Sequence, residues 1–243
     1  MVSDEGWPGL VIHVTGGLSW IEGDDDGLVR TGAGKSMPHL ANWTARRGLT
    51  GLEFLVSIPG SVGGGVRMNA GAHDGEIADH LVAATVFDLD SLTVAELAAR
   101  DLALSYRRSG LGARDLVIDA RFSLESAPRA AIRERMESYR RHRAETQPGA
   151  ASNAGSVFKN PPGDHAGRLV DAAGLKGFSV GGARVSEKHA NFFVAGEGAT
   201  AQDVFDLVHS VRARVKAASG VELEPEVRFA GAFREPASAG AGS

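Results

Sequence analysis

The segment from Asn153 to Pro161 reads Asn-Ala-Gly-Ser-Val-Phe-Lys-Asn-Pro and carries the most information in this chain. It places one hydroxyl, that of Ser156, between Gly155 and the pair Lys159 and Asn160. The chain shows no His and Asp arrangement typical of a serine hydrolase, and a serine without a base is a poor nucleophile. It can still donate a proton to a strongly basic carbon. The alternative is that Ser156 is an ordinary turn or capping residue.

Two further segments stand out, Leu223–Phe229 (Leu-Glu-Pro-Glu-Val-Arg-Phe) and Leu104–Ser109 (Leu-Ser-Tyr-Arg-Arg-Ser). Taken alone, Arg107 is read as a surface charge and Glu226 as a carboxylate on an edge strand. Alternation along 221–229 would put Glu226 on one solvent-facing side with two other glutamates.

A glycine-rich region includes Ile58–Gly65 (Ile-Pro-Gly-Ser-Val-Gly-Gly-Gly) and Met68–His73 (Met-Asn-Ala-Gly-Ala-His). Glycines let the backbone approach a flat ring or a phosphate, and unpaired N–H groups there would be donors. A tight loop with no ligand is an equal alternative from the residues alone. The stretch Gly32–Ser36 fails the spacing of a nucleotide-binding P-loop, so we exclude nucleotide hydrolysis.

Together these segments resemble the UDP-N-acetylenolpyruvoylglucosamine reductase (UDP-N-acetylmuramate dehydrogenase) family, in its shorter subtype, over nearly the whole chain. These flavoenzymes serve peptidoglycan synthesis, and so cell shape and division. The resemblance implies that NADPH reduces FAD, that hydride then reaches C3 of the enolpyruvyl group, and that Ser156 protonates C2. It also implies that Arg107 holds the substrate carboxylate and that a protonated Glu226 bonds the enol oxygen.

The same resemblance implies the binding residues. FAD would contact Gly60, Ser61, Gly63, Gly64, Asn69, Ala70 and Gly71. The UDP-sugar would contact Tyr106, Lys159, Asn160, Lys176 and His189. For His189 a second interpretation stands beside this one, a histidine at a strand start with a backbone partner.

Bulk properties limit the alternatives. The net charge of −4 disfavours general binding to nucleic acid or anionic membranes, and the lack of cysteine excludes disulfides and thiolate zinc sites. No cluster has metal-ligand spacing. No apolar run approaches a membrane span and the start is not a signal peptide, so we expect a cytoplasmic protein. We also expect it to be monomeric.

The pattern of elements predicts an α+β fold, because strands and helices mix without a strict βαβ repeat. The resemblance implies an FAD-binding region at 1–125, related to vanillyl-alcohol oxidase, and a substrate-binding domain at 126–243. The composition predicts disorder after about 233. Strands are predicted at 10–14, 81–88, 115–124, 191–195 and 221–229. Helices are predicted at 37–47, 127–145, 166–173 and from the Thr200 cap to Gly220.

The resemblance also predicts a gap. Family members begin with a strand–helix–strand unit whose glycine-rich loop holds the FAD pyrophosphate, and this chain starts just after that unit. We therefore expect weak FAD binding, and a flavin-free, inactive remnant stays an alternative. Another FAD oxidoreductase of the same fold group, such as a sugar-lactone oxidase, is a third interpretation.

Overall fold

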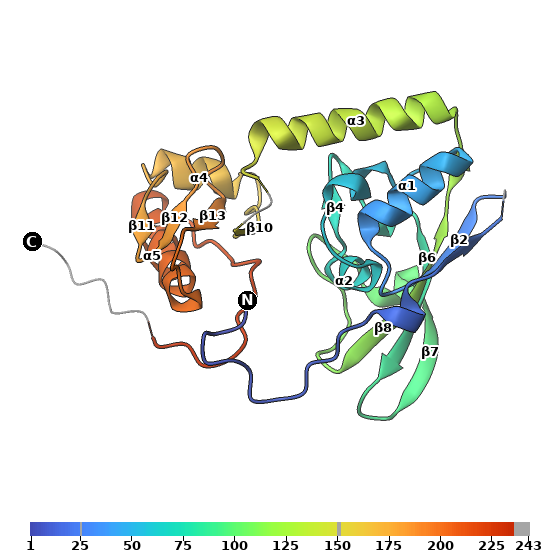
Figure 1. The fold of residues 1–243 in the computed structure, drawn as a ribbon, viewed down its shortest axis with the longest axis horizontal. Helices are drawn as coiled ribbons and strands as arrows, with labels where there is room; N and C mark the ends of the chain where they lie inside the picture. The colour runs from blue at the N-terminus through green and yellow to red at the C-terminus, as the bar shows by residue number, and fades with distance from the viewer. Residues whose placement is uncertain (25, 150–151, 236–243) are drawn as a thin grey trace, which may run out of the picture. The chain divides into compact units, whose positions relative to one another are not determined.

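The computed structural model describes residues 1–24, 26–149 and 152–235, and the chain forms two compact units (Figure 1). The central unit is Ile12–Arg143, and the terminal unit combines Met1–Val11 with Ala144–Ser243. The division at 143/144 differs from the predicted boundary at 125/126, because the helix that begins just after that boundary packs on the central core. The expected disorder after 233 falls mainly on residues 236–243, which lie outside the described ranges.

The central unit is built on a five-stranded antiparallel sheet. In sheet order its strands are Ile21–Gly23 (β1), Leu28–Gly32 (β2), Asp115–Ser123 (β8), Leu81–Asp88 (β6) and Thr93–Ala98 (β7). The predictions at 81–88 and 115–124 are confirmed. Alternation explains the second of them, since Ala120 and Phe122 on β8 are fully buried.

Besides this sheet, the central unit contains helices, and the last of them continues to Thr146. They are Met37–Arg47 (α1), Val62–Met68 (α2) and Arg129–Thr146 (α3), with 3-10 turns at Gly16–Leu18 (η1), Glu53–Ser57 (η2), Ile77–Asp79 (η3) and Ala99–Leu102 (η4). The predicted helices at 37–47 and 127–145 are confirmed. Helix α1 starts with Pro38 in its first turn and ends at Gly48, whose φ of 76° suits a left-handed cap.

Two short antiparallel pairs complete the central unit. Leu49–Thr50 (β3) pairs with Glu125–Ser126 (β9), and Gly71–Ala72 (β4) pairs with Gly75–Glu76 (β5). The β4–β5 hairpin turns through His73 and Asp74, whose φ angles are 53° and 63°. Positive φ at both central residues is the backbone of a type I′ hairpin turn.

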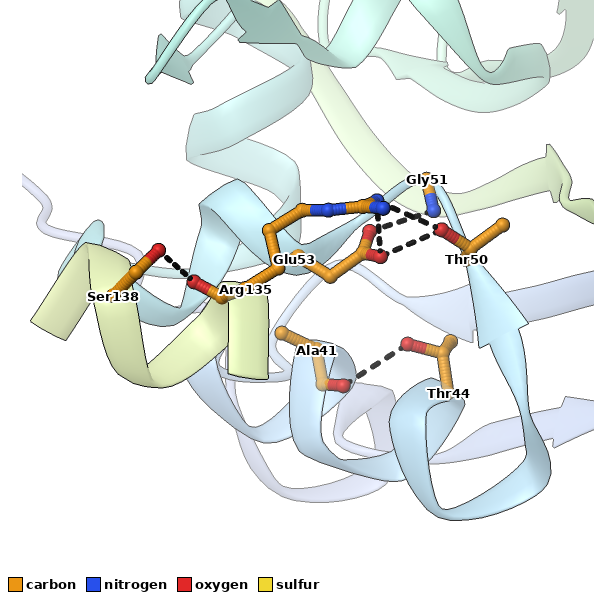
Figure 2. A network of polar contacts seen from close by, with 7 residues as sticks. All are labelled: Ala41, Thr44, Thr50, Gly51, Glu53, Arg135 and Ser138. Atoms are coloured by element: carbon orange, nitrogen blue, oxygen red, sulfur yellow. Dashed lines mark hydrogen bonds and ion pairs between the residues drawn. The ribbon is translucent and has the colours of Figure 1, made fainter. Parts of the chain in front are cut away.

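Helix α3 is attached to the central core through Ile132 and Met136, both buried, and through a polar network around Glu53 (Figure 2). The Glu53 carboxylate accepts hydrogen bonds from the Thr50 hydroxyl (2.6 Å), the Gly51 N–H (2.7 Å) and the Arg135 guanidinium (2.9 Å). Its side chain is only 5% exposed. A buried carboxylate is stable here because each of these donors points at it.

Replacing Glu53 with alanine is therefore expected to lower the free energy of unfolding by about 2 kcal/mol, because buried donors lose their acceptor. Glu137→Ala, at an exposed position of α3, is the matched control and should change little. Urea unfolding followed by tryptophan fluorescence measures both. Equal midpoints for the two variants would show that the network does not fasten α3.

The terminal unit holds a four-stranded antiparallel sheet and two helices. In sheet order the strands are Asn153–Ser156 (β10), Phe192–Ala195 (β13), Ala183–Val185 (β12) and Ser179–Val180 (β11), and the helices are Ala166–Ala172 (α4) and Ala201–Ser219 (α5). The predicted helices and the strand near 191–195 are confirmed. Thr200 and Asp203 form the expected capping box of α5.

Two predicted strands are wrong. Residues 10–14 form no strand, and Leu10 and Val11 are 85% and 72% exposed, so these two side chains join neither hydrophobic core. Residues 221–229 form only an isolated bridge between Phe158 and Pro225. Proline has no N–H to donate to a ladder, although Leu223 is buried as the alternation predicted.

Among the helices that the structure describes, none is long and apolar enough to cross a bilayer. The same residues contain no group of three His, Cys, Asp or Glu side chains that could hold a metal ion.

Candidate active site

The Ser156 segment lies at the end of β10 in the terminal unit. The strand is irregular between Asn153 and Ser156, where Gly155 takes a φ of 82°. Ser156 itself is exposed, and no histidine or carboxylate among the described residues bonds to its hydroxyl. A hydroxyl without such a base is a poor nucleophile, but it can still donate a proton.

Asn191 fixes the backbone that follows Ser156. Its carbonyl accepts the Val157 N–H (2.9 Å), its side-chain oxygen accepts the Phe158 N–H (2.9 Å) and its side-chain nitrogen donates to the Phe158 carbonyl (2.8 Å). Asn191 is buried, and so is Phe158. A buried amide that satisfies both backbone groups of one residue holds that residue in a single conformation.

Glu226 is brought to the same segment by its own backbone. Its N–H donates to the Val157 carbonyl at 2.7 Å, one residue after Ser156. The Phe158–Pro225 bridge extends this pairing. The structure therefore brings together Ser156 and Glu226, which lie 70 positions apart in the sequence.

The two predicted lysines bind carboxylates in this structure. Lys159 Nζ lies 2.7 Å from Glu224, and Lys176 Nζ lies 2.7 Å from Asp171. Both carboxylates are more than half exposed, so these ion pairs are weak and a diphosphate could replace them. Asn160 is exposed and its side-chain oxygen accepts the Ala166 N–H (3.0 Å) at the start of α4.

His189 is half-buried beside the same strand. Its Nδ1 accepts the Asn191 N–H at 3.2 Å, which leaves Nε2 as the protonated nitrogen. Burial lowers the pKa of His189, and the positive charge of Lys176 acts in the same direction. The backbone partner of the second interpretation is thus present, and a role in substrate contact stays a prediction.

In the central unit the structure groups Tyr106 and Arg107 with Asn69 and Gly71. Arg107 has a φ of 54° and sits in a tight turn, and its guanidinium donates to the Gly71 carbonyl at 2.6 Å. It also lies 5.0 Å from the Tyr106 ring. Buried Asn69 donates to the Ser105 carbonyl (3.2 Å) and accepts the Ala78 N–H (2.9 Å). Asn69 therefore joins the Arg107 turn to the β4–β5 region.

The glycine-rich segment differs from the expectation of unpaired backbone donors. Ser61 caps α2, and the N–H groups of residues 62–65 all donate to acceptors inside the protein. In sequence order these acceptors are the Lys35 carbonyl, the Ala33 carbonyl, the Ser61 hydroxyl and the Ser61 carbonyl. A Cβ at Gly63 would lie 2.8 Å from the Ala33 Cβ. Close helix packing, and not ligand binding, therefore accounts for this glycine.

Gly60 and Gly64 are different, because an added Cβ there would meet only a side-chain end. A Cβ added at Gly60 would lie 3.4 Å from the Met37 methyl, and one added at Gly64 would lie 3.5 Å from the Ser61 hydroxyl. Both glycines are exposed. Their bare backbone forms an accessible surface at the start of α2. This surface suits contact with a flat ring such as a flavin, although the Gly64 N–H already donates to the Ser61 hydroxyl.

Two family models match the chain: "FAD binding domain" over residues 2–95 and "UDP-N-acetylenolpyruvoylglucosamine reductase, C-terminal domain" over residues 147–230. A relative from Symbiobacterium thermophilum named UDP-N-acetylenolpyruvoylglucosamine reductase 2 is 48% identical over 232 residues, which is 95% of this chain and 75% of that protein. The chain belongs to the UDP-N-acetylenolpyruvoylglucosamine reductase family. The reductase of Bacillus subtilis is 40% identical over 96% of this chain and 77% of its own.

A solved structure of a reductase of this family, from Thermus caldophilus, has a TM-score of 0.82 and 40% identity, and covers 94% of this chain and 81% of its own. The recognition made from Ser156, Arg107 and Glu226 is therefore confirmed at the level of the family. The predicted α+β fold, with an FAD-binding region followed by a C-terminal domain, is confirmed as well.

Sequence reasoning missed Asn191, the residue that holds the reductase-family serine segment in place. The sequence signal that could have identified Asn191 is its position as a single amide between Ala190 and the apolar pair Phe192 and Phe193. A polar side chain inside such an apolar strand is buried and must find partners.

Proposed function

We propose that this protein reduces UDP-N-acetylenolpyruvoylglucosamine to UDP-N-acetylmuramate, with FAD as its cofactor and NADPH as the hydride donor. Membership of the reductase family supports the reaction. The backbone hydrogen bond between Glu226 and Val157 is the observation that supports assigning the reaction to particular residues. This bond brings a residue with a carboxyl group to the Ser156 segment.

FAD, when bound, supplies the two-electron transfer from NADPH to C3 of the enolpyruvyl group. The residues assigned to FAD lie between the turn before α2 and the start of β4: Gly60, Ser61, Gly63, Gly64, Asn69, Ala70 and Gly71. The exposed backbone at Gly60 and Gly64 supports contact, while Gly63 and buried Asn69 act by shaping this region.

Ser156 is the proton donor in this proposal. Hydride transfer to C3 leaves carbanion or enol character at C2, and such a carbon is basic enough to take a proton from a hydroxyl. Exposure of Ser156 on a backbone fixed by Asn191 supports this role. A protonated Glu226 would stabilise the enol oxygen by a hydrogen bond.

Arg107 is assigned to the substrate carboxylate. A guanidinium binds a carboxylate through two parallel N–H bonds and stabilises the charge that develops on it. The Gly71 carbonyl, which accepts one Arg107 N–H, orients the side chain. We assign Tyr106, Lys159, Asn160, Lys176 and His189 to the sugar and diphosphate.

Arg107→Ala is expected to raise the KM for the enolpyruvyl substrate by about tenfold or more, since a hydrogen bond to a charged group contributes about 1.5–3 kcal/mol. Steady-state NADPH oxidation at varied substrate concentration measures this. Arg108→Ala, the exposed neighbour, is the matched control. An unchanged KM for Arg107→Ala would remove Arg107 from the substrate site.

The function itself is tested with purified protein, added FAD, NADPH and UDP-N-acetylenolpyruvoylglucosamine. Substrate-dependent NADPH loss and a product heavier by two hydrogens are expected by absorbance and mass spectrometry. Oxidation of a sugar lactone instead would favour another FAD oxidoreductase, and a colourless, inactive protein would favour the remnant. A cytoplasmic location and a monomeric state remain predictions.

A further inference from the structure

Three aromatic side chains form a compact stack in the central unit. The His73 ring lies parallel to the Tyr139 ring, with centroids 4.1 Å apart and planes 4° apart, and the His142 ring meets His73 edge-on at 5.6 Å. His73 is the first turn residue of the β4–β5 hairpin, whereas Tyr139 and His142 belong to α3. The stack therefore fastens the tip of the hairpin to a helix.

The same hairpin carries the contact of Arg107. The Gly71 carbonyl on β4 accepts the Arg107 guanidinium, and Gly71 pairs with Glu76 across the hairpin. The hairpin also packs on Phe54, because an added Cβ at Gly75 would lie 2.8 Å from that ring. A shift of the hairpin would move the carbonyl that orients Arg107.

We propose that His73, stacked between α3 and the hairpin, is a positioning residue that holds Arg107 for the substrate carboxylate, and that its protonation weakens substrate binding. This inference rests on the proposed function, which assigns Arg107 to the substrate. His73 acts through the hairpin and touches no substrate.

The charges around His73 give the direction of the pH effect. Burial is the main cause that lowers the pKa of His73 below its usual 6.5; His142 and the Arg143 guanidinium lower it further, and Asp74 opposes them. Burial also raises the pKa of Tyr139, so this ring stays neutral. Glu53 and Arg135 lie near Tyr139 and act on it with opposite signs.

A released hairpin would expose His73 to water and return its pKa to the usual value. The released form then binds more protons than the stacked form at acidic pH. The stack is therefore fully stable above about pH 6.5 and loses stability as the pH falls below it.

Three proteins test this: the parent, His73→Phe, which keeps a flat ring without a titrating group, and His73→Ala, which removes the ring. The KM for the enolpyruvyl substrate is measured at about pH 7.5 and about pH 5.5, the range in which histidine titrates. For each protein the KM at about pH 5.5 is divided by the KM at about pH 7.5. We expect this ratio to be about fivefold larger for the parent than for His73→Phe, which is the low end for coupling between sites. His73→Ala should show a raised KM at both values with kcat little changed.

Hydrogen exchange at the hairpin base supplies a readout that needs no turnover. The N–H groups of Ile77 and Ala78 bond to the Ala70 carbonyl and the Asn69 side chain. After correction for intrinsic rates, acid should lower their protection in the parent and not in His73→Phe. If the proposed function fails, this comparison still reports on the stack. Equal pH dependence of protection, or of KM, in the parent and His73→Phe overturns the inference.

Discussion

Ser156→Ala is expected to slow reduction of the enolpyruvyl substrate by at least about 10²-fold, the low end for loss of a general acid. Hydride transfer to C3 leaves negative charge at C2, and an alanine offers no proton to C2 to complete the reduction. Binding should change little, because Ser156 is exposed and its backbone is held by Asn191. Steady-state assays of kcat and KM separate the two effects.

Ser179→Ala is the control for this variant. Ser179 is an exposed serine of the same sheet, and its hydroxyl donates to the Gly177 carbonyl at 3.1 Å. Its loss should leave kcat within about twofold, as surface substitutions usually do. If both alanine variants keep the parental kcat, Ser156 is a loop residue and the assignment of the acid is wrong.

Asn191→Ala is expected to destabilise the terminal unit by about 2–4 kcal/mol, because two backbone groups of buried Phe158 lose their partners at once. Activity should fall with stability, since the same amide holds the backbone next to Ser156. Thermal and urea unfolding followed by circular dichroism measure the change.

Asn191→Asp removes only one of the two side-chain hydrogen bonds to Phe158. The carboxylate still accepts the Phe158 N–H but has no N–H for the Phe158 carbonyl, so an intermediate loss is expected near neutral pH. Unfolding midpoints equal to that of the parent in both variants would mean that water satisfies Phe158 and that Asn191 does not fix the segment.

Regular elements were largely predictable from local pattern. Helix α5 has a capping box at Thr200, helical apolar spacing and a terminal glycine, and each is a local signal. The second half of strand β8 alternates, with Ala120 and Phe122 buried and Arg121 between them less buried. The segments 10–14 and 221–229 failed because an apolar or alternating run becomes a strand only when a partner supplies hydrogen bonds, and Pro225 cannot donate one.

The site was predictable in its residues and not in its contacts. The motif around Ser156 indicated the family, and the family resemblance implied that Glu226 and Arg107 are site residues. Three features of the site depend on tertiary contacts. They are the pairing of Glu226 with Val157, the ion pair of Lys159 with Glu224, and the hydrogen bonds that the N–H groups near Gly63 donate inside the protein. A sequence alone does not encode which donors remain available once helix α2 has packed.

Transient kinetics of Ser156→Ala tests the central claim most directly. The variant with FAD is mixed first with NADPH and then with UDP-N-acetylenolpyruvoylglucosamine, while the flavin absorbance is followed. We predict a first phase close to that of the parent and a second phase slowed by at least about 10²-fold, because the serine acts only on the substrate carbon. A second phase at the parental rate, or equal slowing of both phases, would contradict the assignment of Ser156 as the proton donor.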